Sequence, residues 1–173
     1  DNSVDLQLST TNGRGAAGAN SFVVGINNHA TNILSVAIGK SNTSEGANSF
    51  ALGENNTTNT TSKSSMALGI GVKSLGENSG SLVFGAADPT GELSINYGVG
   101  NLAFGNAEAN STIQAPLAGD LNAGNGNLVH GHVSTGGQIN VLNNGDAPNG
   151  SHVFGEAVDN GIITAKGPGS QTF

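Results

Sequence analysis

The feature that most limits the folds open to this sequence is a five-residue unit that occurs eight times. Its pattern is Ser or Asn, an apolar residue, Ala or Val, a second apolar residue, and Gly, with His at one apolar position in each of the last two copies. Repetition of this kind is typical of folds in which every repeat forms the same short element. The eight pentads occupy residues 21–25, 35–39, 49–53, 65–69, 81–85, 101–105, 127–131 and 151–155.

The closing glycines of the pentads give the length of the repeat. They stand at positions 25, 39 and 53 and then at 69 and 85, so a period of 14 expands to 16, and the later intervals are wider still. Residues 18–22 and 46–50 have identical sequences and lie 28 positions apart, which is twice 14. We expect degenerate coils around Gly119 and Gly145, and we interpret residues 94–98 as an imperfect pentad.

A repeat of this length predicts one β-coil per period. The period is too short for a pair of helices, and the apolar residues do not recur at the helical period of about 3.6. The closing Gly can adopt the positive φ of a sharp corner, and the Asn, Ser and Thr residues between pentads are good turn formers. Stacked coils would pair their strands in parallel at about 4.8 Å per coil, so ten or eleven coils would form a rod roughly 50 Å long.

The predicted architecture is therefore all-β, a single-stranded parallel β-solenoid or β-roll with coils of about 14 residues. We assign the chain to one solenoid segment, residues 1–173, with three parts. Residues 1–17 form a lead-in or cap, residues 18–85 form regular coils with a period of 14 to 16, and residues 86–173 form degenerate coils with longer loops.

Composition and charge agree with a thin core and narrow the range of partners. Only 35% of the residues are apolar and 4% are aromatic, too few for a thick core of the usual kind. The net charge is -7 and the five basic residues are scattered, which argues against binding to nucleic acid or to an anionic membrane surface. No apolar run approaches the roughly 20 residues of a spanning helix, so we expect no direct membrane insertion by this segment.

Alternation along the pentad predicts which side chains face inward. Positions two and four share one face of the strand, and we expect their large side chains to fill the coil. Position three is always Ala or Val and points the other way, and a strand that is apolar on both faces is buried on both. A second copy of the chain is the simplest cover for that face, although the pattern fits any rotational symmetry. The predicted interface residues are Val23, Ala37, Ala51, Ala67, Val83, Ala103, Val129 and Val153.

Residues 34–39 and 48–53 resemble a repeat of a known family. They are similar to the Asn-Ser-Val-Ala-Ile-Gly repeat of YadA-like head domains, the heads of trimeric autotransporter adhesins of type V secretion. That family also has a small residue and a Gly after the pentad, as Ser44 and Gly46 are here. The resemblance is close over residues 18–85 and patchy beyond them.

The resemblance implies a homotrimer of left-handed parallel β-rolls on the bacterial cell surface, beyond the outer membrane. It implies a non-enzymatic adhesin head that binds host extracellular matrix, cells or other surfaces. A bacteriophage tail-fibre or spike segment, carried on a virion and binding a host receptor, would use the same kind of self-associating solenoid and stays an open alternative. Neither function requires a cofactor, and we expect none.

Other residues suggest no catalytic site and, at most, a weak metal site. The carboxylates fall mostly in turns and do not pair at strand spacing, and no Gly-x-Ser-x-Gly elbow is present, so we expect no enzymatic activity. His130, His132 and His152 are the weak metal candidates, because one His from each chain of a trimer could form a shared site. The alternative, which we prefer, is that His130 and His152 occupy core pentad positions and pair with each other, with water or with carbonyl groups.

The polar stretch at residues 55–62 is the candidate ligand-binding segment. It lies where the period expands from 14 to 16, and its simplest interpretation is a solvated loop. A hydrogen-bonding contact surface and an ice-binding Thr array are the alternatives, although the other coils do not provide the regular Thr ranks that ice binding needs. The candidate residues are Asn55, Asn56, Thr57, Thr58, Asn59 and Thr60.

Overall fold

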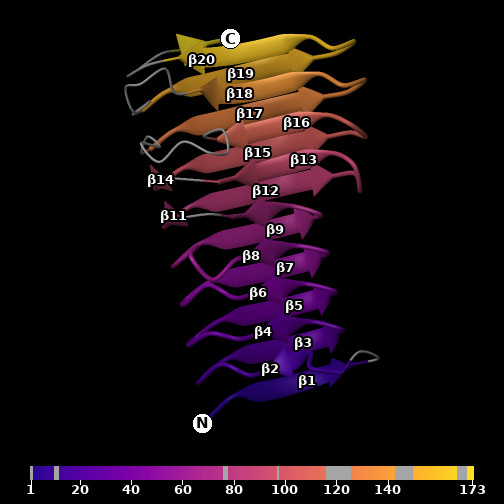
Figure 1. The fold of residues 1–173 in the computed structure, drawn as a ribbon, viewed down its shortest axis with the longest axis vertical. Coiled ribbons are helices and arrows are strands. Elements are labelled where there is room, and N and C mark those ends of the chain that lie inside the picture. The colour runs from indigo at the N-terminus through magenta and orange to yellow at the C-terminus, as the bar shows by residue number, and fades with distance from the viewer. Residues whose placement is uncertain are drawn as a thin grey trace.

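The computed structural model describes residues 2–9, 12–75, 78–96, 98–115, 126–142, 150–166 and 171–173. The described residues contain no helix, and their strands form two long parallel sheets that run the length of the molecule (Figure 1). Each turn of the chain adds one strand to the first sheet and then one to the second, which makes the molecule a β-solenoid. The predicted all-β architecture of stacked parallel strands is confirmed for these residues.

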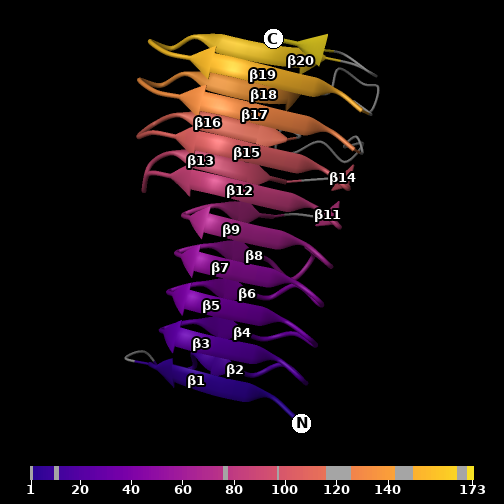
Figure 2. The same cartoon turned by 180° about the vertical axis from the view of Figure 1, so that it is seen from behind.

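The first sheet contains the eight pentads, with β1 and β21 as its outermost strands. Its ten strands pair in parallel and in register, so that Val23 lies beside Ala37, and Ala37 beside Ala51. Figure 2 shows these strands from the opposite side of the solenoid. In stacking order the strands are β1 (Val4–Leu8), β3 (Phe22–Ile26), β5 (Val36–Lys40), β7 (Phe50–Glu54), β9 (Met66–Ile70), β12 (Leu82–Ala87), β15 (Leu102–Ala107), β17 (Leu128–Val133), β19 (His152–Ala157) and β21 (Gln171–Thr172).

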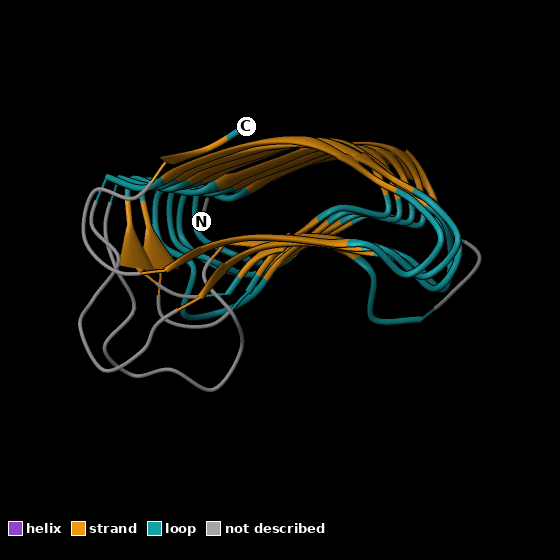
Figure 3. Cartoon of the chain, turned by 90° about the horizontal axis from the view of Figure 1, so that it is seen from above, coloured by secondary structure: helices purple, strands orange, loops and turns teal. Residues whose placement is uncertain are grey.

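The second sheet closes each coil and was not predicted. Seen along the solenoid, the two sheets face each other across a thin interior (Figure 3). The early strands of this sheet are only two residues long, too short to give a recognisable sequence pattern. Its strands are β2 (Gly15–Ala16), β4 (His29–Ala30), β6 (Thr43–Ser44), β8 (Thr57–Thr58), β10 (Lys73–Ser74), β13 (Glu92–Ile95), β16 (Thr112–Ala115), β18 (Gln138–Leu142) and β20 (Ile162–Lys166), and β11 (Asn78–Ser79) pairs separately with β14 (Gly98–Val99).

The late pentads pair directly with one another despite the wide intervals between them. Gly105 pairs with Gly131, and Gly131 pairs with Gly155, so no strand of the first sheet intervenes. The degenerate coils expected around Gly119 and Gly145 fall on residues outside the described part of the chain. Residues 94–98 are not a further pentad, because Ser94 and Ile95 belong to β13 of the second sheet.

The coils change size part-way along the molecule. Strands of the second sheet have two residues up to β10 and four or five from β13 onward, and the pentad strands lengthen from five residues to six at β12. We call residues 12–75 the narrow coils and residues 82–166 the wide coils. The widening is visible in Figure 1, where the turns from β12 upward project further than those below.

The predicted assignment of the two pentad faces is wrong. All eight position-three residues are completely buried inside the single chain, so none of them can face a neighbouring copy. Positions two and four point outward and are half-buried or exposed, as for Phe50 and Phe84. The physical reason is the small interior of the coil. In the narrow coils the space between the sheets holds Ala or Val but not Phe or Leu, and in the wide coils position three shares the interior with second-sheet side chains such as Leu93. The buried residues are Val23, Ala37, Ala51, Ala67, Val83, Ala103, Val129 and Val153.

The narrow coils have a polar interior. Asn28, Asn42 and Asn56 are fully buried and stack in register, one in each coil. The Asn42 side-chain amide donates to the carbonyl oxygens of Ile38 and Gly53 at 2.8 Å each, and its Oδ1 accepts from the Asn56 backbone N–H at 3.0 Å. This ladder satisfies backbone groups at the turn where the chain leaves the first sheet.

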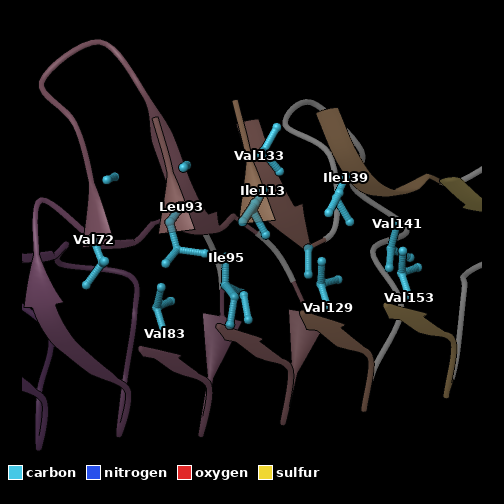
Figure 4. Close-up of a cluster of buried hydrophobic side chains, with 14 of the residues drawn as sticks. Val72, Val83, Leu93, Ile95, Ile113, Val129, Val133, Ile139, Val141 and Val153 are labelled. Atoms are coloured by element: carbon cyan, nitrogen blue, oxygen red, sulfur yellow. The ribbon is translucent and has the colours of Figure 1, made fainter. Parts of the chain in front are cut away.

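The wide coils have an apolar interior instead. The longer second-sheet strands bring Leu93, Ile113 and Ile139 into register, one above another, and all three are fully buried (Figure 4). Val83, Val129 and other residues of the first sheet belong to the same cluster. The extra width therefore provides room for larger apolar side chains.

The pentad glycines lie inside the strands and not at the corners. Gly53 has a φ of 117°, and a Cβ atom placed on it would lie 2.0 Å from the carbonyl oxygen of Gly69 in the next coil. Both the backbone angle and the close stacking exclude a side chain at this position. The corner comes two residues later, where Asn55 has a φ of 56°.

Candidate functional site

The outer side of the first sheet is a surface that continues from coil to coil. We call its position-two and position-four side chains the pentad face. Eight pentads with two such positions each give sixteen residues, of which fourteen are apolar and two are histidines. The face comprises Phe22, Val24, Val36, Ile38, Phe50, Leu52, Met66, Leu68, Leu82, Phe84, Leu102, Phe104, Leu128, His130, His152 and Phe154.

The pentad face forms two continuous ranks along the rod. Parallel in-register pairing places position two over position two and position four over position four from one coil to the next. Phe84 is 51% exposed, Phe50 is 38% exposed and Leu82 is 36% exposed in the single chain. Soluble monomers rarely leave a long contiguous apolar patch open to water, so this face has the character of an interface.

Aromatic rings dominate the face in the wide coils. The rings of Phe104 and His130 stack with their centroids 4.0 Å apart and their planes 15° apart. Phe154 meets His130 edge-on at 5.9 Å, and Phe173 stacks on Phe154 at the same distance. These contacts hold the outward rings in a fixed row, as aromatic ladders on a sheet do.

Charged side chains lie beside the pentad face, one position after the glycine. Lys40 Nζ and Glu54 Oε1 are 2.7 Å apart on adjacent coils, and their side chains are 59% and 41% exposed. His132 occupies the equivalent position in a wide coil, where its Nε2 lies 3.5 Å from Glu108 Oε1. The apolar ranks are thus bordered on this side by a partly charged row.

The predicted ligand-binding segment is only partly at the surface. Asn56 and Thr58 are fully buried inside the coil, because one belongs to the Asn ladder and the other points inward from β8. The Thr58 hydroxyl lies 2.8 Å from the Ser49 hydroxyl. The expectation of a solvated loop is therefore wrong for these two residues. The other candidates, Asn55, Thr57, Asn59 and Thr60, are partly or fully accessible.

The three candidate metal-binding histidines do not form a cluster within one chain. His130 and His152 belong to the pentad face and are not core residues, contrary to the sequence-based expectation, because positions two and four point outward. His132 lies further along β17, next to Glu108. Among the described residues, no group of three His, Cys, Asp or Glu side chains is placed to hold a metal ion.

A small hollow lies where the narrow coils meet the wide ones. It has a volume of about 270 Å³, and Ile70, Lys73, Asp88 and Pro89 are among its lining residues. The wider coil projects beyond the narrower one at this point and forms a ledge. The lining combines one cation, one carboxylate, one side-chain amide and apolar groups, and it contains no Ser, Thr, Cys or His.

The sequence did contain a signal that distinguishes the two faces of the pentad strand, but we assigned it to the outer face. Restriction of position three to Ala and Val indicates a tight space, and that space is the inside of the coil. The Asn ladder was also detectable, because Asn28, Asn42 and Asn56 each follow a pentad glycine by three residues.

Comparisons of the chain with protein-family models, curated proteins and solved structures found no match. The similarity to YadA-like heads thus stays a prediction based on the pentad residues. In the part of the chain that the structure describes, no helix is long and apolar enough to cross a membrane.

Proposed function

We propose that this chain is the head segment of a trimeric adhesin on a bacterial cell surface, which binds host matrix, cells or other surfaces without catalysing a reaction. In this proposal three left-handed β-rolls associate side by side through their pentad faces. The observation that carries the proposal is the pentad face, which runs along eight strands and is apolar at fourteen of its sixteen positions. The number three and the handedness come from the resemblance of the pentads to YadA-like heads.

The energetics of the pentad face favour self-association. Burying one Val, Leu, Ile, Phe or Met side chain contributes about 1.5–3 kcal/mol relative to leaving it exposed. Fourteen such residues, each partly covered already, supply a large driving force even after the cost of association. A rotation axis parallel to the rod lets every coil contribute the same contact, which suits a repeat protein.

An adhesive role follows from what remains exposed after this association. The turns and the outer side of the second sheet stay accessible, with Asn55, Thr57, Asn59 and Thr60 among their polar residues. Single contacts through such groups are weak. Three chains on a rigid rod would present each contact several times, and avidity would raise the overall affinity.

The first experiment tests self-association. Light scattering coupled to size-exclusion chromatography should give three times the 17.0 kDa chain mass for the wild type. Phe50→Glu should weaken association at least about tenfold, because it places a charge in the pentad face. Thr60→Glu, at an exposed turn position, is the matched control and should leave the mass unchanged. A stable wild-type monomer, or equal effects of the two variants, would refute the proposal.

The second experiment tests adhesion. Beads coated with the oligomer should bind immobilised extracellular-matrix proteins or cultured host cells, and beads coated with Phe50→Glu should bind less because avidity is lost. Retention on bacterial cells, with no binding to host material, would instead support the tail-fibre alternative. Absence of binding to every surface would contradict both functions.

A further inference from the structure

The two exceptions to the apolar pentad face are both histidines. His130 and His152 occupy positions four and two of adjacent pentads, and no Asp, Glu, Lys or Arg occurs among the sixteen residues of the face. Histidine is the side chain that changes charge close to neutral pH, with an ordinary pKa of about 6.5. The face is therefore free of permanent charge, and the ionisable side chains among its sixteen residues are these two histidines.

The immediate surroundings of the two rings are aromatic. His130 stacks on Phe104 at 4.0 Å and meets Phe154 edge-on at 5.9 Å. The ring of His152 lies 6.5 Å from the ring of Phe154, in a T-shaped arrangement. Both histidines are thus part of the aromatic row that the proposed contact would cover.

The charged groups nearby lie on the far side of the pentad glycine. Among the described side chains of β17, β19 and the elements packed against them, they are Glu108 after β15, His132 on β17 and Glu156 on β19. Glu108 contacts His132, and Glu156 is in register with His132. The ion pairs in the described part of the chain join Lys40 to Glu54 and His132 to Glu108, so neither His130 nor His152 has a carboxylate partner of this kind.

We propose that the wide-coil end of the pentad face is a pH-sensitive contact, through which copies of the chain associate at neutral pH and separate when His130 and His152 are protonated. This inference rests on the self-association described under the proposed function. A neutral imidazole can be buried against aromatic rings, whereas an imidazolium must release its proton or be buried as an unpaired ion.

The direction of the effect follows from linkage. A contact that buries neutral imidazole rings is strongest above the ordinary pKa of histidine, about 6.5, because a free imidazole carries no charge there. As the pH falls below that value, the separate chains bind protons that the assembly excludes, and association weakens. At pH 5 each buried ring should weaken it about 30-fold, since the pH is then about 1.5 units below the ordinary pKa of histidine.

The test measures self-association of the full chain by sedimentation velocity at pH 7.5 and pH 5.0, at constant ionic strength. The wild-type dissociation constant should rise at least about 30-fold at the lower pH. The double variant His130→Phe, His152→Leu places at each site the residue found in register on the preceding coil, and its constant should change less than about threefold. His29→Gln, on the second sheet, is the matched control and should behave like the wild type.

The possible failures are distinguishable. A wild type that assembles equally well at both pH values overturns the pH-sensitive contact and leaves self-association standing. A monomer at both pH values overturns self-association and the pH-sensitive contact with it. Circular dichroism at pH 5.0 completes the test, because loss of the β signal in wild type and double variant alike would mean that acid acts on the fold, and this too would overturn the inference.

Discussion

The narrow and the wide coils present the same outer face over different interiors. In the narrow coils the buried residues include the Asn ladder and the hydroxyls of Ser44 and Thr58, whereas in the wide coils the stacked residues are Leu93, Ile113 and Ile139. The pentads continue through both regions, and their outward positions stay apolar except at the two histidines. Apolar character outside therefore does not depend on what fills the coil, which indicates that the pentad face has a role of its own.

The comparison also shows two ways to stabilise a thin solenoid. A narrow coil has little apolar surface to bury, so it satisfies its backbone groups with side-chain amides and hydroxyls. A wide coil has room for branched aliphatic side chains and gains stability from their burial. Because each coil contacts mainly its neighbours, the effect of a substitution should stay near its own region. Native-state hydrogen exchange can therefore assign each effect to one region.

The largest expected effect is in the narrow coils, at the Asn ladder. Asn42→Ala should lower the free energy of unfolding by about 4 kcal/mol, because it leaves two carbonyl oxygens and one N–H without partners in a buried site. Chemical denaturation measures the loss, and hydrogen exchange should locate it in the coils next to Asn42. Thr60→Ala, at an exposed turn, serves as the control. A loss below about 1 kcal/mol would show that the ladder does not support the narrow coils.

The loss of unfolding free energy on removing a buried side chain from the wide coils should be somewhat smaller. Leu93→Ala should cost about 3 kcal/mol through lost burial and the cavity that remains. The same denaturation and exchange measurements apply, with faster exchange expected from β12 to β16. Ile162→Ala removes a side chain that is 67% exposed and should cost less than about 0.5 kcal/mol. If both variants had the same effect, burial of the aliphatic rank would not be what stabilises this region.

A third difference concerns the residue that precedes each pentad. This residue has a positive φ in all eight coils, and it is Gly in the wide coils but Leu34, with a φ of 54°, in one narrow coil. Leu34→Asn should raise the free energy of unfolding by about 1 kcal/mol, since Asn adopts this conformation more readily. The midpoint of thermal unfolding measures the gain. Ile33→Asn, at the neighbouring exposed position, should bring none, and an equal gain there would contradict the explanation.

The smallest effect is expected at the exposed ion pair of the narrow coils. Lys40→Met breaks the contact with Glu54 and should cost no more than about 0.5 kcal/mol, because both side chains are accessible and the attraction is screened. Denaturation at low and at high salt measures the difference, which should vanish at high salt. A larger, salt-independent loss would mean that the Lys40 side chain stabilises the coil through packing.

The sequence by itself determined the strand, its register and the direction of stacking. Eight pentads with a Gly at a fixed place were enough to predict parallel β-coils, because a strand repeated at a short period can pair with its own copies in only one way. The unequal intervals between the later glycines did not predict that Gly105 pairs directly with Gly131, and Gly131 with Gly155.

Only the tertiary structure decided which pentad face is the inside. Alternation along a strand defines two faces but does not say which of them points into the coil. That depends on the distance to the opposite sheet, whose strands in the narrow coils have only two residues and no recognisable sequence pattern. Ala51 is therefore a core residue and Phe50 a surface residue, so Ala51→Glu would disrupt the coil itself, whereas Phe50→Glu should disrupt only the assembly.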